Sequence, residues 1–298
     1  MGLVASSNFG YLLVPGLRKV FMDEYGAPGD VVPQLFSFEK SSKAVEYDLG
    51  IGGMGDMEEF NGTIPYGDFH QQYRVSYTHK EWVKGIKVER KLVDDDQYNI
   101  INQRPRQLAV VAKRTREKHG ASLFNNAFNT SIFAGGDTLA LCATAHTWVG
   151  TASTWGNSGT DSLSATALEA TRILGMQLLD ETDNLMDIQY DTLLIPPNLQ
   201  ETSNIIIKSE WRSGVANNDM NWNKDRYNII VWNRLTDSNN WYLIDSKYMK
   251  MFLKWFDRIP VEFNKDKDFD TYVSKWSCYT RYGYGFSGWQ FIYGQNVS

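Results

Sequence analysis

Polar and apolar residues follow a helical period in the segment between Lys91 and Thr130. From Lys91 to His119 this segment contains no glycine and a single proline, Pro105, which predicts a long helix with a kink or a new first turn at that residue. Three consecutive aspartates, at 94–96, stand where carboxylates stabilise the N-terminus of a helix. We therefore expect a spine helix within residues 91–130.

The two sides of this helix differ in character when residues are spaced at 100°. One side is expected to be buried and carries Leu108, Val111, Ala112, Thr115 and His119. The opposite side carries Arg106, Lys113 and Glu117 and is expected to face solvent. Between residues 104 and 118 there are six basic residues and one acidic residue, a local charge of +5 in a chain of net charge −5.

Two different patterns precede the spine. Residues 12–25 have helical spacing and end at a Gly-Ala-Pro-Gly sequence, so we expect residues 1–45 to form an N-terminal arm. Residues 46–90 begin with many glycines and continue with two strand-like runs, 73–77 and 82–88, which predict a long two-stranded hairpin. Because an isolated hairpin is marginally stable in water, we expect it to lie against another copy of the chain.

The middle of the chain alternates between irregular and regular segments. Residues 133–163 are rich in Ser, Thr and Gly and predict an irregular loop. Ser164 is a typical N-cap for a helix whose buried side would carry Leu168, Leu174, Leu178 and Leu179. A buried strand at 192–195 stops at two prolines, a helix is expected at 198–209, and a second buried strand at 227–231.

Aromatic strands dominate the last quarter of the chain, at 241–245, 250–256 and 271–293. In the last of these, Tyr282, Tyr284 and Phe286 share one face of the strand, and Gly283 and Gly285 share the other. A glycine face admits close approach by another element. We expect the spine helix to pack there.

Composition excludes several classes of protein. The chain has 298 residues, 42% of them apolar and 22% charged, which is ordinary for a folded protein. No apolar run is long enough to cross a membrane and no signal peptide is evident, so we expect a soluble protein that is not secreted. The net negative charge argues against a dedicated nucleic-acid-binding module. Cys142 and Cys278 are expected to be buried reduced thiols.

A search for converging catalytic groups gives no enzyme motif. The four histidines, at 70, 79, 119 and 146, have no metal-binding spacing, and the aspartates at 94–96 are explained by the helix start. The aspartates at 266, 268 and 270 lack the glycine and glutamate of a calcium loop. We expect no catalytic residues, no metal and no cofactor. A soluble enzyme with a site in the 133–163 loop stays open as the alternative.

Several short segments together resemble one known family, in their order along the chain. They are RPRQLA (104–109), LSATALEA (163–170), DTLLIPPNL (191–199), WYLID (241–245) and RYGYG with a later tryptophan (281–289). This order is similar to that of the Mu-like (gpT-type) major head subunit of tailed bacteriophages, from about Phe9 to Trp289. The resemblance implies an α+β subunit of the HK97-type capsid fold, in many copies that form a shell around double-stranded DNA.

The resemblance also implies a division of the chain. Residues 1–45 would form the N-terminal arm, 46–90 an extended loop, 91–130 with 241–298 a peripheral domain, and 131–240 an axial domain. Copies would associate as pentamers and hexamers in the host bacterial cytoplasm and end in the virion capsid, with scaffolding, portal and decoration proteins as further partners. Because no helical leader precedes the arm, we expect either a separate scaffolding protein or prior processing. The basic side of the spine, Arg106, Lys113 and Arg114, would face the packaged DNA without reading its sequence.

Overall fold

The structure is a computed structural model that describes residues 10–27, 29–57, 59–64, 66, 70–89, 91, 100–133, 135–151, 153–212, 219–268, 271 and 273–297. Its helices are α1 (Gly10–Tyr25), α2 (Val32–Leu35), α4 (Ile100–Asn125), α5 (Ala165–Met176), the 3-10 turn η2 (Pro197–Leu199), α6 (Gln200–Lys208) and α7 (Ser246–Phe252). The first strands are β1 (Ser37–Lys40), β2 (Val45–Ile51), β3 (Gln71–Thr78), β4 (Lys80–Val88), β5 (His146–Thr147), β6 (Thr154–Trp155) and β7 (Ser158–Gly159). The later strands are β8 (Thr192–Ile195), β9 (Asn228–Val231), β10 (Trp241–Ile244), β11 (Leu253–Lys267), β12 (Ser274–Phe286) and β13 (Ile292–Gln295).

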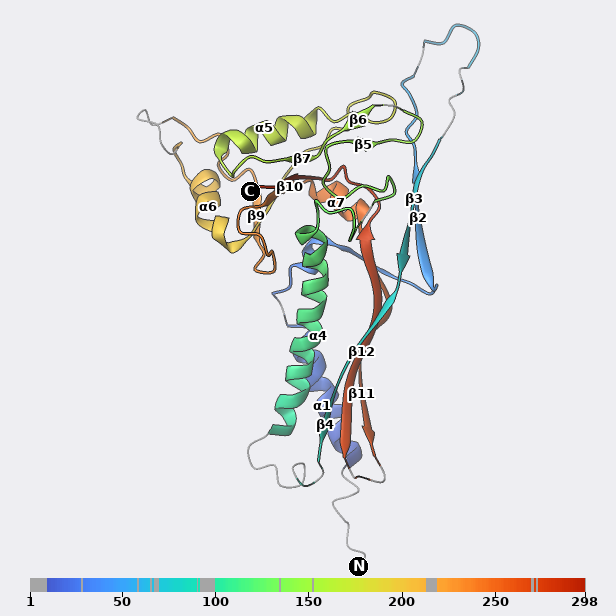
Figure 1. The fold of residues 1–298 in the computed structure, drawn as a ribbon, viewed down its shortest axis with the longest axis vertical. Helices are drawn as coiled ribbons and strands as arrows, with labels where there is room; N and C mark the ends of the chain where they lie inside the picture. The colour runs from blue at the N-terminus through green and yellow to red at the C-terminus, as the bar shows by residue number, and fades with distance from the viewer. Residues whose placement is uncertain are drawn as a thin grey trace, which may run out of the picture.

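A long sheet and two helices form the lower, elongated half of the molecule (Figure 1). This long sheet has the order β1-β11-β12-β4, and α4 and α1 lie on one of its faces. Between helices and sheet, Leu17, Phe21 and Leu108 pack against Phe263 and Trp276. The N-terminal helix therefore packs on its own chain, because its apolar side completes this core.

The expected spine helix is present as α4, and its side chains depart from the expected pattern at two positions, Lys113 and Glu117. Leu108 is buried as expected, and Pro105 lies inside the helix. Glu117, expected on the solvent side, is also buried. Its carboxylate accepts hydrogen bonds from the backbone N–H of Val32 and from Nε1 of Trp232, both at 3.0 Å. The aspartates expected at the helix start lie outside the described residues.

The hairpin prediction was wrong in its strand pairing. Strand β3 pairs with β2, through Thr78 and Val45 at one end and Gln71 and Ile51 at the other. Strand β4 instead joins β12 in the long sheet. The error arose because residues 45–51 are interrupted by glycine and look less strand-like than 82–88. The projecting hairpin is therefore 45–78, and 80–88 belongs to the body of the subunit.

The expected packing of the spine on a glycine face was also wrong. The spine lies on the tyrosine face, where Nδ1 of His119 is 2.7 Å from the hydroxyl of Tyr282. The glycine face meets the end of β3: a Cβ at Gly285 would lie 3.0 Å from the ring of Tyr77. The glycines thus admit close approach, as expected, but by a strand.

A second sheet, of order β7-β13-β10-β8-β9, forms the upper half of the molecule (Figure 1). One face of this second sheet packs against α5 and α6, and the other packs against the end of α4 and against α7. The hydroxyl of Ser164 caps α5 as expected, but Leu174 is exposed and the buried side of α5 carries Ala167, Leu168, Thr171 and Gly175. Residues 250–252, expected to be in a strand, end helix α7.

The expected boundary at residue 241 does not follow the sheets. Strands β10 and β13 were assigned with the terminal segment to the peripheral domain, yet they pair with the middle segment in the second sheet. Each half of the molecule is therefore built from segments far apart in the sequence. The separation into an N-terminal arm, an extended loop and two domains stays a proposal.

Candidate assembly interface

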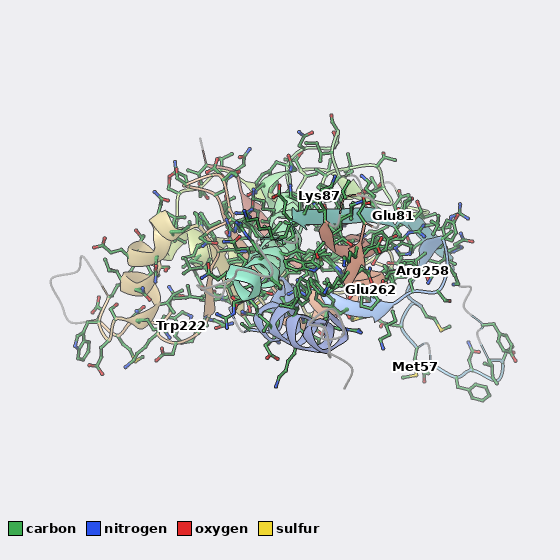
Figure 2. All side chains as sticks on the ribbon, turned by 90° about the horizontal axis from the view of Figure 1, so that it is seen from below. Met57, Glu81, Lys87, Trp222, Arg258 and Glu262 are labelled. Carbon is green, nitrogen blue, oxygen red and sulfur yellow. The ribbon has the colours of Figure 1, made fainter. Side chains whose placement is uncertain are left out.

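The hairpin β2–β3 and its connecting loop project from the body of the subunit (Figure 1). The hairpin and loop display large apolar side chains to solvent: Tyr47, Leu49, Met54, Met57, Phe60, Ile64 and Tyr66. Met57 is fully exposed and Tyr66 is 89% exposed, and Figure 2 shows Met57 far out on this loop. Exposed apolar patches of this kind mark interaction surfaces. Because these residues have so few contacts in their own chain, the hairpin is the strongest candidate for a contact with a partner.

We call Gly53, Gln72 and Tyr73 the root of the hairpin. These residues are fixed to the loop that follows the spine and to the turn after α5. The side chain of Gln72 accepts a hydrogen bond from the backbone N–H of Val149 at 2.9 Å. The hydroxyls of Tyr73 and Thr147 are 2.9 Å apart. In addition, the backbone N–H of Gly53 donates to the carboxylate of Glu181, in the turn after α5. These bonds hold the root while the tip extends into solvent.

Glycines let the root approach the body closely. A Cβ at Gly136 would lie 2.4 Å from Cβ of Tyr73, a distance at which the backbone must move. The contact at Gly285 is less severe, since a Cβ there would lie 3.0 Å from the ring of Tyr77. The direction of the hairpin therefore depends on residues without side chains at the points of contact.

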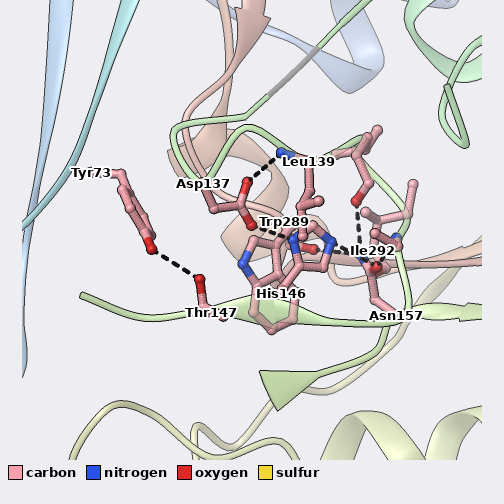
Figure 3. A network of polar contacts seen from close by, with 10 residues as sticks. Tyr73, Asp137, Leu139, His146, Thr147, Asn157, Trp289 and Ile292 are labelled. Atoms are coloured by element: carbon pink, nitrogen blue, oxygen red, sulfur yellow. Dashed lines mark hydrogen bonds and ion pairs between the residues drawn. The ribbon is translucent and has the colours of Figure 1, made fainter. Parts of the chain in front are cut away.

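A buried polar network supports the loop that holds the root (Figure 3). Nδ1 of His146 is 2.5 Å from Asp137, and Nε2 is 3.1 Å from Oδ1 of Asn157. The Asn157 amide nitrogen donates to the backbone carbonyls of Leu141, Trp289 and Ile292. The His146 ring also stacks on Trp289, with 4.3 Å between ring centroids. Both ring nitrogens of His146 thus face oxygen acceptors, and the network joins the irregular loop to the second sheet.

The cleft beside this network does not support the enzyme alternative. Its volume is about 470 Å³, and Asp137, Thr147 and Trp148 contribute to its wall. His146 is completely buried, and the side chain of Asp137 is 3% exposed. Since both groups are buried and hydrogen-bonded to the protein, they serve the fold of the loop. A general acid or base must reach the proton it transfers.

The three basic residues expected to face DNA lie in two different environments. Arg106 and Arg114 are exposed on α4. Lys113 is mostly buried and lies 3.3 Å from Asp30 in the arm, which also pairs with Arg116. This carboxylate offsets part of the local positive charge. Of the three residues expected to face DNA, only the two arginines therefore present their charge to solvent.

The cysteines and two further histidines, His79 and His119, are also part of the packed interior. Cys142 and Cys278 are buried and free, as expected, and burial raises the pKa of both thiols, to about 11 for Cys278. Burial lowers the pKa of His79 and of His119. Within the described ranges, His, Cys, Asp and Glu side chains form no group of three or more that could hold a metal ion. Among the helices that the structure describes, none has the length and apolar character needed to cross a membrane.

Sequence patterns missed the residues that hold the hairpin root. Tyr73 was assigned to a strand and Gln72 directly precedes it, but their partners at 147–149 lie in a segment without periodicity. Asn157 has five hydrogen-bonding contacts, although in the sequence it resembles any other loop asparagine. The available signal was the Gly156-Asn157 pair inside a polar segment, which indicates a turn and no more.

Comparisons with solved structures place this fold among the shells of phages. The chain is similar to the capsid protein of cyanophage P-SCSP1u, with 13% identity, a TM-score of 0.60, and coverage of 91% of this chain and 88% of that one. It is similar to the procapsid protein of bacteriophage JBD30, with 13% identity, a TM-score of 0.57, and coverage of 99% and 77%. It is also similar to a chain of Microbacterium phage Oxtober96, with 11% identity, a TM-score of 0.56, and coverage of 91% and 92%.

At such low identities these similarities establish the fold, which is α+β and consistent with the HK97 type. No curated protein sequence matches the chain. A family model described as "Phage capsid protein" matches residues 72–294, which is most of the chain. The molecule is therefore a structural protein of the phage capsid and not an enzyme. The chain belongs to the phage capsid protein family.

Proposed function

We propose that the hairpin of residues 45–78 clamps each subunit to a neighbouring copy in the shell, within pentamers and hexamers. The observation that carries this proposal is the series of exposed apolar side chains on a projecting hairpin, among them Met57 and Tyr66. Burial of apolar surface stabilises by about 25 cal/mol per Å², so several such side chains supply a contact that a polar loop would not. The root bonds of Gln72 and Tyr73 keep the hairpin in a fixed direction before assembly.

The test is to shorten the hairpin. A variant in which residues 54–69 are replaced by a short turn keeps β2, β3 and the root bonds of Gly53, Gln72 and Tyr73, so the subunit is expected to fold normally. We expect its circular dichroism to match that of the wild type and its assembly to stop at free subunits. Sedimentation velocity and negative-stain microscopy measure this directly. Normal shells from the shortened chain would contradict the clamp.

The basic surface of α4 is proposed to lie near packaged DNA. Arg106 and Arg114 support this because they are exposed. The double variant with Glu at both positions is expected to assemble shells that fill poorly with DNA, since each lost phosphate contact weakens non-specific binding. Lys113 is better left unchanged in this test, because a glutamate there would face Asp30 and disturb the fold. Wild-type genome content would remove the DNA role.

A capsid subunit is expected to have partners other than its own copies. We propose that a scaffolding protein and a portal protein act during assembly in the host bacterial cytoplasm, and that the subunit is of the Mu-like type. Decoration is a further expectation: one similar chain comes from a JBD30 capsid decorated with minor capsid protein trimers. Co-expression of the subunit with candidate head proteins, followed by microscopy of the particles, tests each partner separately.

A further inference from the structure

One residue separates the hairpin from the long sheet. Strand β3 ends at Thr78 and pairs with β2, whereas β4 begins at Lys80 and pairs with β12. His79 alone lies between the two strands. The backbone at this residue leaves one sheet and enters the other. Contacts made by His79 therefore bear directly on the angle between the hairpin and the body of the subunit.

His79 is buried and ends a chain of hydrogen bonds. Its Nε2 is 3.0 Å from the hydroxyl of Ser41, and that hydroxyl is 2.8 Å from Oε1 of Glu46. A carboxylate can only accept, so Ser41 donates its one proton to Glu46 and accepts a hydrogen bond from His79. The ring is then neutral with its proton on Nε2. This arrangement joins β2 and the segment after β1 to the junction of β3 and β4.

The other ring nitrogen faces the long sheet. Nδ1 of His79 is buried and has no hydrogen-bond partner among the described residues. A Cβ at Gly283 would lie 3.0 Å from this nitrogen, so β12 passes directly beside it. A proton added at Nδ1 would place a positive charge in a buried position without a hydrogen-bond acceptor. Such a charge is costly to bury.

The charged groups around His79 oppose its protonation on balance. Arg281 of β12 and Arg258 of β11 disfavour a positive ring, and Glu46 of β2 favours it. Burial is the largest effect, and it lowers the pKa of His79 below the ordinary value of 6.5. The hydrogen bond from Ser41 lowers the pKa of Glu46 and so keeps its carboxylate charged.

We propose that His79 is an acid-sensitive latch, which fixes the junction of β3 and β4 when neutral and loosens this junction when a proton binds Nδ1. The direction of the pH dependence follows from the lowered pKa of His79. The latched form is fully stabilised above the ordinary pKa of a free histidine, and this stabilisation is lost as the pH falls from there through the lower pKa of the buried ring. The proposal concerns the single subunit and does not depend on where the hairpin docks in a shell.

The experiment measures the hairpin angle in the free subunit. Spin labels are placed at Leu49→Cys on β2 and Val83→Cys on β4, both exposed positions. Strand geometry of about 3.3 Å per residue puts the labels roughly 30 Å apart, within reach of pulsed electron paramagnetic resonance. The native cysteines are buried and do not compete for the label. We expect a narrow distance distribution at pH 8 that broadens or shifts at pH 5, with a midpoint below 6.5.

Three variants test whether His79 causes the response to acid. His79→Gln retains a donor for Ser41 but cannot titrate, so it is expected to give the narrow distribution at both pH values. His70→Gln changes an exposed histidine of the same hairpin region and is expected to keep the acid response. Arg281→Gln removes an opposing charge and is expected to move the midpoint to higher pH. An identical distribution at pH 8 and pH 5, or an acid response that survives in His79→Gln, would overturn the latch.

Discussion

Glu117 offers the sharpest test of how the three parts of the subunit are joined. Its two carboxylate oxygens accept hydrogen bonds from Val32, at the start of α2, and from Trp232, just after β9. The glutamate itself lies on α4 and is 8% exposed. One buried side chain thus connects the arm, the spine and the second sheet. Substituting Glu117→Gln keeps the shape but removes the charge and one acceptor.

The expected loss of stability follows from the two hydrogen bonds that Glu117 accepts. A hydrogen bond to a charged group contributes about 1.5–3 kcal/mol and one between neutral groups about 0.5–1.5 kcal/mol, while a buried donor left without an acceptor costs about 1–3 kcal/mol. Glutamine retains one acceptor and presents its NH2 group to the other donor. We therefore expect a loss of about 2–4 kcal/mol in the free energy of unfolding. Glu117→Ala leaves both donors unsatisfied and should cost more.

Urea denaturation of the purified subunit, followed by tryptophan fluorescence, measures this loss. The matched control is Glu262→Gln, an exposed glutamate on β11 that is labelled in Figure 2. A surface change of that kind is expected to stay within about 0.5 kcal/mol of the wild type. The cost of Glu117→Gln should also shrink in a Trp232→Phe background, where the donor is absent. Equal stability of the Glu117 and Glu262 variants would refute the reasoning.

Three further predictions concern the hairpin root and the core. Asn157→Ala removes donors to three buried carbonyls and should cost about 3–5 kcal/mol, measured by the same denaturation; a loss below 1 kcal/mol would contradict it. Gly136→Ala should displace Tyr73 and slow assembly without unfolding the subunit, whereas Gly55→Ala, with open space around it, should assemble normally in sedimentation velocity. His119→Gln should flatten the fall in stability below about pH 6.5, because burial and Lys80 lower the pKa of His119 and its neutral form stabilises the folded state. A pH profile identical to that of the wild type would show that His119 contributes nothing to it.

Elements with strong local signals could be predicted from the sequence. The spine, the capped helix at 165–176, the strand stopped by Pro196 and the aromatic strand at 241–244 all occur where expected. Each depends on contacts near in sequence, such as the Ser164 cap. The order of these segments also indicated the family, although every motif is short.

The sequence could not predict which of two elements, far apart along the chain, packs or pairs with a given segment. Strand β3 pairs with β2 although β4 is its neighbour in sequence, because its glycine-interrupted partner reaches it across a loop. Gly283 and Gly285 indicated close approach without saying which element approaches. Glu117 looked like a solvent-facing charge, since its two donors come from residues 85 and 115 positions away. The root of the hairpin depends on such long-range contacts throughout.

The most direct test of the central claim is electron cryomicroscopy of particles assembled from the purified chain. The account predicts closed shells of pentamers and hexamers in which residues 45–78 of one copy lie on the next, with Met57 and Tyr66 buried at that contact. Particles in which the hairpin folds back on its own subunit, or a chain that stays monomeric at every concentration, would contradict it.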